Sequence, residues 1–343
     1  LEDANTRPAL AADFRTGAGF DFTVLPDRGM DIAAAHYHGK SLAWRSCTGD
    51  VAPQYFEAEG IRWLRSYFGG LVTTCGLTNV GAPAADSAVS GRGLHGRIGN
   101  IPARNLKQTQ EWRDGKYLLS LEGTLREAAL FCENLNLTRT VSAYMGETRF
   151  FIHDEIVNEG FEPTPFQILY HCNIGWPALD AHSRMISASA RIAPRDATAA
   201  DGIEAWSRMD PPTPGYAEKV YYHDMRPADD GGVTVAIVNE SLDGAPFGVY
   251  VKYNKNELPR FTQWKMMGEQ AYVLGLEPCN CGVEGRAADE ALGLLEVLEP
   301  GTKKFITLEF GVIADSTTLA EVEIACQAPA PQFVDSYKAF FGK

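Results

Sequence analysis

Basic residues are scarce in this chain, with 31 Lys and Arg against 44 Asp and Glu and a formal net charge of −13. Nucleic acids and anionic membrane surfaces are bound by clustered Lys and Arg, so this balance argues against both as partners. No run of about 18 apolar residues, as a membrane-spanning helix needs, is present. The motif GxxxxGK[ST] does not occur, and strands do not alternate with helices, which argues against a nucleotide-binding α/β fold.

Cysteines are few and scattered, and their number, seven, is odd. Only Cys279 and Cys281 lie close together, and no second Cys or His pair accompanies them as a zinc site would require. This usage does not fit a disulfide framework. Reduced thiols in a cytoplasmic protein are the expectation.

Short segments of alternating polarity, separated by turns, make up most of the chain. The segment RFFIHDEIVN (149–158) alternates, so that Phe150, Ile152 and Ile156 face one way. Asp-Gly, Gly-Gly and Pro-Gly pairs punctuate the sequence between or before such segments. Further strands are predicted at 116–123, 232–240, 247–255, 271–278 and 303–313.

Helical patterns are few, and the best of them cover 53–68 and about 317–342. The Pro-rich segment MDPPTPGYAE (209–218) lies between strand candidates and is predicted to be a long functional loop. Hydrophobic residues make up 45% of the chain, which is ample for a core. We predict one all-β domain over residues 1–343, built from two stacked antiparallel sheets with a few short helices.

Two histidines stand in settings that favour a functional site. His95 lies in SGRGLHGRIGNIPA (90–103), where glycines let the backbone take positive φ and approach a ligand. His171 lies within the apolar segment FQILYHCNIGWPAL (166–179), close to the Trp-Pro pair that ends it, and Asn173 shares its face. Either histidine could instead be a structural residue, His95 in a loop and His171 in the core.

Glu277 follows Val-Leu-Gly-Leu in YVLGLEPCN (272–280), an expensive place for a carboxylate unless it is paired or hydrogen-bonded. Burial there would raise its pKa toward the range of a general base. The alternative is an edge-strand glutamate that faces water. Together with the two histidines, Glu277 indicates acid–base chemistry on a small neutral ligand. No GxSxG nucleophile motif is present, and a Cys–His pair using Cys75 or Cys172 has no local signature.

Blocks throughout the chain resemble the aldose 1-epimerase (galactose mutarotase-like) superfamily, and most closely a bacterial branch labelled as a domain of unknown function. The resemblance implies a β-supersandwich and an enzyme of carbohydrate metabolism that interconverts the anomers of a sugar, with a small carbohydrate as its substrate. The matching blocks are VLPDRGMDI (24–32), GGLVTTCGLTNVG (69–81), GLHGRIGNIPA (93–103), YHCNIGWP (170–177), PGYAEKVYYHD (214–224), QWKMMGEQAYVLGLEPCN (263–280) and LEPGTKKFITLEFGV (298–312).

The resemblance assigns three catalytic roles. Glu277, in a Leu-Glu-Pro block, would take the proton of the anomeric hydroxyl, and protonated His171 would give one to the ring oxygen. His95, in a Leu-His-Gly block, would hold the ring oxygen or a neighbouring hydroxyl, and Asn173 would be a companion in the pocket. This mechanism needs neither a metal nor a cofactor.

The binding residues of the sugar epimerases are matched only in part. Their Asn-Arg pair before the first histidine corresponds here to Asn79 without an arginine, which Arg28 or Arg97 could replace. Their sugar-binding aspartate has Glu218 or His223 as candidate counterparts.

The block Gln263-Trp264-Lys265 is peculiar to the branch. Trp264 suggests a platform for the apolar face of a sugar, and Lys265 suggests a contact with a hydroxyl or carboxylate. Trp264 could equally be a core residue, and Lys265 and Arg28 could pair with surface acids. The altered binding residues suggest a sugar that need not be galactose or glucose.

Two other functions are compatible with these residues. One is an isomerase or lyase acting on an oxidised sugar, with a divalent metal held by the histidines and Glu277, together with Glu218 or His223. The other is a non-catalytic sugar-binding module, for which a glutamate at position 277 would not be needed. The sequence does not set the oligomeric state, and a homodimer is one assembly that it allows.

Overall fold

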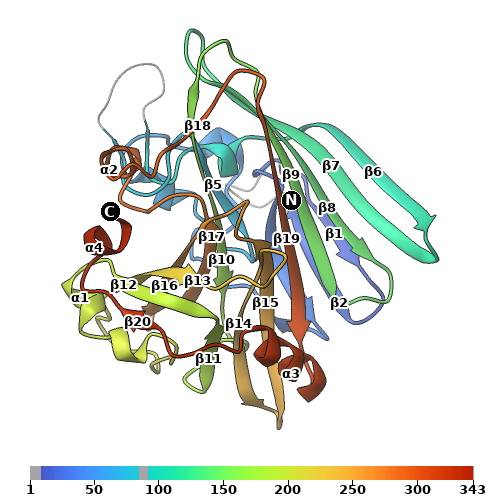
Figure 1. Ribbon diagram of the computed structural model, residues 1–343. Coiled ribbons are helices and arrows are strands. Elements are labelled where there is room, and N and C mark those ends of the chain that lie inside the picture. Colours follow the sequence, from blue (N-terminus) through green and yellow to red (C-terminus); the bar gives the residue numbers. More distant parts are fainter. Residues whose placement is uncertain (1–8, 85–91, 343) are drawn as a thin grey trace.

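The computed structural model describes residues 9–84 and 92–342. Within these residues the alternating segments form strands that pair antiparallel, except for one parallel pair at a sheet edge, in a four-stranded sheet and two eight-stranded sheets (Figure 1). The all-β fold predicted from the sequence is therefore confirmed. The four-stranded sheet contains β1 (Ala12–Arg15), β2 (Phe20–Leu25), β3 (Asp31–Tyr37) and β4 (Lys40–Ser41).

One of the large sheets carries the candidate site and is called the site sheet. Its strands, in spatial order, are β18 (Glu296–Leu298), β10 (Thr164–Ile174), β17 (Tyr272–Cys279), β16 (Arg260–Met267), β13 (Lys219–Met225), β12 (Ser189–Pro194) and β20 (Gln332–Phe333), and β5 (Thr73–Leu77) also pairs with β10.

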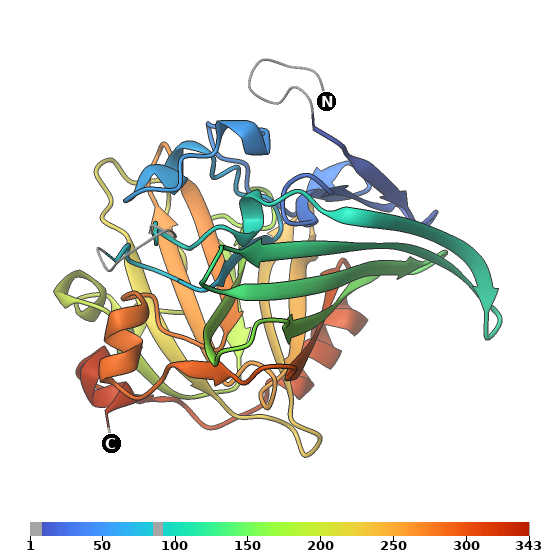
Figure 2. The same cartoon turned by 90° about the horizontal axis from the view of Figure 1, so that it is seen from above.

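The other large sheet is called the outer sheet. Its strands, in spatial order, are β11 (Ser183–Ser187), β14 (Gly232–Leu242), β15 (Ala245–Asn254), β19 (Lys303–Ile313), β9 (Arg149–Asn158), β8 (Asn134–Tyr144), β7 (Lys116–Ala128) and β6 (Arg104–Arg113). The hairpin of β6 and β7, in turquoise, projects from the body of the molecule (Figure 2). The predicted strands at 149–158 and 303–313 have the bounds of β9 and β19.

The helix predicted at 53–68 is wrong. Only two short 3₁₀ turns form there, η2 (Pro53–Tyr55) and η3 (Arg62–Arg65), and Gly60 between them has a φ of 55°. The tail forms α3 (Ser316–Ala325) and α4 (Tyr337–Phe341) instead of one long helix, because two prolines interrupt it. The remaining short elements are η4 (Ile98–Asn100), α1 (Ala197–Ala200), η5 (Ile203–Ala205) and α2 (Arg286–Ala291).

The main hydrophobic core is formed by residues of all three sheets. The even-numbered side chains of β9 face it, as the alternation predicts, and Phe150 stacks on Phe310 of β19 with ring centroids 4.8 Å apart. Phe22 of the four-stranded sheet also stacks on Phe150, with ring centroids 4.6 Å apart. Burial of such apolar area is the main stabilising contribution to the fold. Within the described ranges, no helix is long and apolar enough to cross a membrane.

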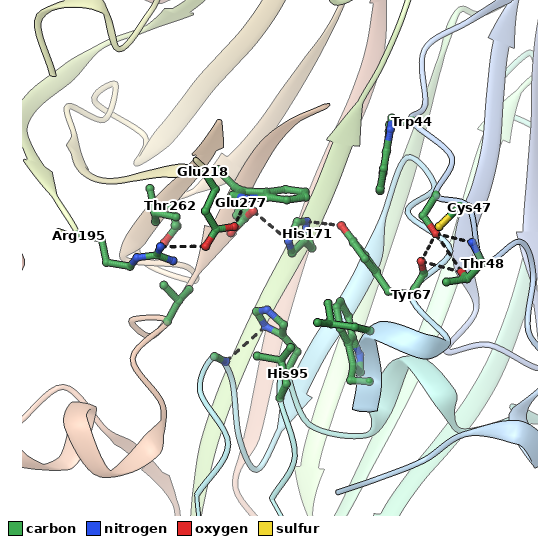
Figure 3. Close-up of a pocket in the computed structure, with 18 residues that line it drawn as sticks. Trp44, Cys47, Thr48, Tyr67, His95, His171, Arg195, Glu218, Thr262 and Glu277 are labelled. Carbon is green, nitrogen blue, oxygen red and sulfur yellow. Dashed lines mark hydrogen bonds and ion pairs between the residues drawn. The ribbon is translucent and has the colours of Figure 1, made fainter. Parts of the chain in front are cut away.

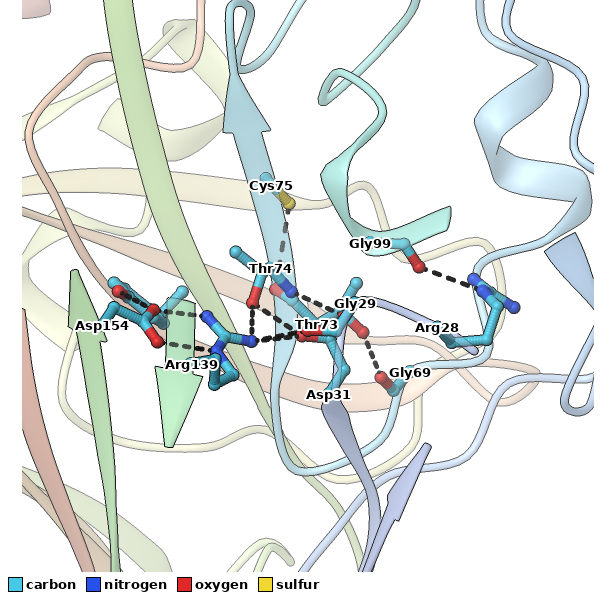
Figure 4. Close-up of polar contacts among 11 residues, drawn as sticks. Arg28, Gly29, Asp31, Gly69, Thr73, Thr74, Cys75, Gly99, Arg139 and Asp154 are labelled. Atoms are coloured by element: carbon cyan, nitrogen blue, oxygen red, sulfur yellow. Dashed lines mark hydrogen bonds and ion pairs between the residues drawn. The ribbon is translucent and has the colours of Figure 1, made fainter. Parts of the chain in front are cut away.

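A buried polar network lies where the three sheets meet (Figure 4). Arg139 on β8 makes a bidentate ion pair with Asp154 on β9, at 2.6 and 2.9 Å. The same guanidinium contacts Asp31 at 3.0 Å and the hydroxyl of Thr74 at 2.7 Å. These charged side chains are fully buried, so the cost of removing each from water is offset only by its pairing with the others.

Candidate active site

A pocket of about 410 Å³ lies on the face of the site sheet that is turned away from the main core (Figure 3). Strands β10, β13, β16 and β17 form its floor, and loops before β5 and around residue 95 form its other walls. Its lining residues are Trp44, Ser46, Cys47, Thr48, Trp63, Leu64, Tyr67, Gly81, Leu94, His95, His171, Arg195, Glu218, Val220, Thr262, Trp264, Glu277 and Val283.

Strand register brings the predicted acid–base pair together. In the pairing of β10 with β17, Cys172 opposes Leu276, which places His171 across from Glu277. Side chains directly opposite each other in antiparallel strands have Cβ atoms about 5 Å apart. The Nε2 atom of His171 lies 3.2 Å from Oε1 of Glu277, and both side chains are almost completely buried.

The amide of Asn173 fixes which nitrogen of His171 carries a proton. Its Nδ2 donates to the backbone carbonyls of Gly70 and His171, at 3.1 and 2.8 Å, so its Oδ1 faces Tyr67. The Tyr67 hydroxyl donates its single proton to Oδ1 at 2.5 Å, and its oxygen lies 3.1 Å from Nδ1 of His171. That oxygen can then only accept from His171, so Nδ1 is protonated and Nε2 keeps its lone pair.

Glu277 has an oxygen that no described residue satisfies. Although Oε1 lies near Nε2 of His171, the contact does not have hydrogen-bond alignment, and Oε1 is buried without a hydrogen-bond partner in the described ranges. Unsatisfied buried carboxylate oxygens are rare and costly in native proteins. Oε1 of Glu277 could therefore accept a hydrogen bond from a hydroxyl of a ligand in the pocket.

Burial shifts the proton affinities of the pair in opposite directions. It raises the pKa of Glu277 well above its ordinary value and lowers the pKa of His171 to about 3, with His95 adding to the second shift. These directions favour a proton on Glu277 and a neutral His171. The mechanism that the sequence resemblance implies starts from the reverse distribution, with protonated His171.

His95 offers the pocket a hydrogen-bond donor. The backbone N–H of Gly81 donates to its Nδ1 at 3.3 Å, so the neutral ring carries its proton on Nε2. Burial lowers its pKa to about 4, although the residue keeps partial exposure. His95 itself has a φ of 57°, and a Cβ on Gly96 would lie 2.4 Å from a backbone oxygen. The glycine-rich loop thus allows the close approach that the sequence predicts.

Aromatic rings surround the acid–base pair. Trp264 lies edge-on to His171 with ring centroids 5.3 Å apart, and Trp44 lies edge-on to Trp264 at 6.3 Å. Trp63 stacks on Tyr67 at 4.4 Å. Such rings suit the apolar C–H faces of a sugar while the polar groups between them select its hydroxyls.

One charged pair lies at the pocket, formed by Glu218 before β13 and Arg195 after β12. Oε1 of Glu218 accepts from Nη2 of Arg195 at 2.9 Å, and Oε2 accepts from the indole N–H of Trp264 at 2.8 Å. Nε of Arg195 donates to Asp196 at 3.1 Å. Burial opposes the positive charge of Arg195, but these two carboxylates raise its pKa overall.

Five of the predicted site residues line this pocket, namely His95, His171, Glu218, Trp264 and Glu277. Asn173 lies behind them and acts through Tyr67. Arg28 does not reach the pocket, because its guanidinium donates to the carbonyls of Val51, Ser66 and Gly99.

Asn79 and Arg97 also lie outside the pocket lining. Asn79 is buried and holds the histidine loop by donating to Gly93 and Ala82. Arg97 is exposed, and its backbone N–H donates to Gly76.

His223, Gln263 and Lys265 lie on the opposite face of the site sheet from Trp264. Nε2 of His223 contacts the amide oxygen of Gln263 at 3.1 Å. Lys265 pairs with Asp210 at 3.0 Å and donates to the carbonyl of Arg208. Adjacent residues of a strand face opposite ways, so Gln263 and Lys265 could not share the pocket with Trp264.

The pocket residues that escaped prediction include Trp44, Trp63, Tyr67 and Arg195. Trp63 and Tyr67 fell in the segment read as a helix, and Arg195 follows a short strand that the sequence did not predict. Tyr67 lies 104 residues from its partner His171. No local pattern reports a contact between segments so far apart.

Within residues 9–84 and 92–342, no group of three or more His, Cys, Asp or Glu side chains is placed to hold a metal ion.

Comparison with known families finds a match over most of the chain. Residues 7–312 match the family described as "Domain of unknown function (DUF4432)". A sequence search of curated proteins finds no significant match.

Several solved structures share the fold. A "putative aldose 1-epimerase" from Klebsiella pneumoniae superposes with a TM-score of 0.92 at 24% identity, covering 98% of this chain and 88% of that one. A galactose mutarotase-like protein from Clostridium acetobutylicum has a TM-score of 0.58 at 11% identity, over 88% and 94% of the chains. Galactose 1-epimerase from Lactobacillus acidophilus has a TM-score of 0.57 at 13% identity, over 92% and 97%. The galactose mutarotase-like fold is thereby confirmed.

Proposed function

Because the chain belongs to the DUF4432 family and has the galactose mutarotase-like fold, we propose that it is a sugar-processing isomerase of the aldose 1-epimerase type. Its substrate would be a monosaccharide or sugar derivative whose two anomers it interconverts. The observation that carries the proposal is the pair of His171 and Glu277, 3.2 Å apart at the base of an aromatic pocket.

Anomer exchange is proton transfer without net gain or loss of protons. The anomeric O1–H loses a proton, the ring oxygen O5 gains one, and the C1–O5 bond breaks to give the open-chain aldehyde. Rotation about C1–C2 and the reverse transfers close the ring on the other face. Two groups that hold one labile proton between them are therefore sufficient, and each contributes about 10²–10⁴-fold when positioned.

Glu277 and His171 fit the two roles when a hydroxyl binds. A hydrogen bond from the anomeric O1–H to the unsatisfied Oε1 of Glu277 stabilises the carboxylate and lowers its pKa. As the pair, 3.2 Å apart, aligns around the bound hydroxyl, the proton of Glu277 passes to Nε2 of His171, which delivers it to O5. Nε2–H of His95 supplies a donor for the ring oxygen or a neighbouring hydroxyl.

The direct test is anomer exchange across a broad panel of aldoses, uronates and deoxysugars. Pure anomers are dissolved with and without the protein, and equilibration is followed by polarimetry and by NMR magnetisation transfer. We expect acceleration for at least one sugar, and loss of that acceleration in His171→Asn. His153→Asn, an exposed histidine on β9, is the matched control. No acceleration for any sugar in the panel would contradict the proposal.

A further inference from the structure

Arg195 is the only Lys or Arg side chain among the described residues that line the pocket. Its guanidinium is already engaged, with Nε on Asp196 and Nη2 on Glu218. Glu218 in turn uses its second oxygen to accept from the indole of Trp264. One cation is thus held between two carboxylates, and Glu277 adds a third carboxyl group to the same pocket.

We infer that this arrangement selects neutral aldoses and rejects sugars that carry a carboxylate or phosphate, with Glu218 as the residue that sets the preference. The inference rests on the proposed function and names its substrate class. Without Glu218 beside it, an arginine in a sugar pocket would favour anionic sugars.

The selectivity follows from charge and from hydrogen-bonding capacity. An anionic group brought to Arg195 would approach Glu218, whose like charge repels it in a partly desolvated site. It would also have to displace Glu218 from both Arg195 and Trp264 in order to gain the guanidinium. A sugar hydroxyl meets neither difficulty, since it can donate to a Glu218 oxygen and accept from an arginine N–H at once.

Removing the charge of Glu218 should therefore reverse the preference. In Glu218→Gln, the amide oxygen still accepts from Arg195 or Trp264. The guanidinium keeps Asp196 at Nε, but its Nη2 side no longer faces a carboxylate. Glu218 is exposed by 45%, so this change leaves the core packing intact. Matched probes are glucose with glucuronate and galactose with galacturonate, each sugar differing from its partner only at C6.

Binding is measured by ligand-observed NMR and thermal shift, and anomer exchange is measured on the same samples. Wild type should bind the neutral member of a pair at least about tenfold more tightly than the uronate. Glu218→Gln should reduce that ratio by about tenfold or more, through tighter uronate binding.

The control uses an arginine with the same kind of partners elsewhere in the molecule. Arg184 pairs with Glu240 through Nε and with Glu323 through Nη2, as Arg195 does with Asp196 and Glu218. Glu323→Gln should leave the neutral-to-uronate ratio unchanged. The double variant Arg195→Met with Glu218→Gln should lose the gain in uronate binding, because the guanidinium is its source.

The inference is overturned if wild type binds uronates as tightly as the neutral sugars, or if Glu218→Gln leaves the ratio unchanged. It is also overturned if the double variant keeps the gain. Because the binding readout does not need turnover, failure of the proposed epimerase activity is visible separately. In that case no sugar exchanges its anomers faster, while the binding preference and its reversal are still measured.

Discussion

At the residue scale, a short relay of hydrogen bonds prepares His171 for its role. Two backbone carbonyls orient the amide of Asn173, the amide orients the hydroxyl of Tyr67, and the hydroxyl fixes the tautomer of His171. Tyr67 therefore acts as a positioning residue, because it is placed to direct the lone pair of Nε2 toward Glu277. Histidines that act in proton transfer commonly depend on such a partner at the other nitrogen.

Tyr67→Phe should lower the rate of anomer exchange by about 10- to 100-fold while the protein still folds, because the preferred tautomer of His171 loses its support. The lost hydrogen bonds should also reduce the free energy of unfolding by about 1–3 kcal/mol. ¹⁵N chemical shifts of His171 should report an Nδ1–H tautomer in wild type and a mixture in the variant. Tyr250→Phe, whose hydroxyl donates to Glu309 in the outer sheet, is the matched control and should leave exchange unchanged.

The buried carboxyl of Glu277 predicts a particular dependence of stability on pH. Its pKa in the folded protein is raised by burial, so its contribution to stability is present below its unfolded pKa of about 4.5 and is lost as the pH rises above it. Glu277→Gln has no such loss. The difference in unfolding free energy, variant minus wild type, should therefore be flat below about pH 4.5 and then grow by up to about 1.4 kcal/mol per pH unit.

Denaturant titrations of both proteins between pH 4 and pH 8 would measure this difference, with the range set by the unfolded pKa of about 4.5. A difference that stays constant through neutral pH would mean that Glu277 and His171 hold no proton between them. The proposed two-group mechanism would then lack the proton that His171 must deliver.

At the element scale, β17 leaves room for Glu277 by placing a glycine two residues before it. A Cβ on Gly275 would lie 2.3 Å from Oε1 of Glu277 and 2.9 Å from the Cβ of Trp264. Trp264 opposes Gly275 on the neighbouring strand β16, so the two strands pack closely there. The lack of a side chain at Gly275 thus leaves space for the Glu277 carboxyl group, although glycine weakens a strand in general.

Gly275→Ala should displace the carboxylate of Glu277 and lower the anomer-exchange rate by about tenfold or more, since small misplacements of a reacting group have large effects. Gly232→Ala on β14 is the matched control, because its Cβ would meet another carboxylate oxygen, that of Asp230, at 2.9 Å. Kinetics and unfolding of both variants should show comparable stabilities but activity loss only in Gly275→Ala. Equal activity in the two variants would contradict this role of Gly275.

From strand patterns we could predict those site residues that lie within strands or beside glycines. His171 and Glu277 could be found because each departs from the apolar pattern of its strand, and Trp264 because it belongs to a recognisable block. Lys265 and Gln263 belong to the same block, yet alternation sends them to the other face of the sheet. The sequence alone could not tell which face of β16 meets the pocket.

At the scale of the whole molecule, the buried network of Arg139 joins three sheets. Arg139 and Asp154 belong to the outer sheet, Asp31 to the four-stranded sheet and Thr74 to β5 beside the site strand β10. Tyr170 of β10 donates to Asp154 from the opposite side of the strand from His171. The network therefore lies directly behind the acid–base pair.

Arg139→Met should lower the free energy of unfolding by about 3–5 kcal/mol, because it leaves two buried carboxylates without their cation. Arg126→Met removes an exposed ion pair with Glu159 and should change it by no more than about 1 kcal/mol. Urea unfolding followed by circular dichroism would compare them. Similar losses in the two variants would show that the buried network contributes little to holding the sheets together.

The all-β architecture could be predicted from alternation and turns, and β9 and β19 have the predicted bounds. The arrangement of the strands into three sheets could not, because it depends on contacts between distant segments. The loop carrying Trp63 and Tyr67 was misread as a helix, since its aromatic residues pack against the pocket and not along one helical face. Tertiary packing determined both outcomes.

The central claim is that Glu277 and His171 exchange anomers by acid–base catalysis. It is tested most directly by measuring sugar binding and anomer exchange together in wild type and Glu277→Gln, using the sugar that wild type accelerates most. We predict that the variant still binds this sugar but exchanges its anomers at least about 100-fold more slowly. Equal exchange rates in the two proteins would contradict the claim, and binding without any exchange in wild type would assign the pocket to sugar binding alone.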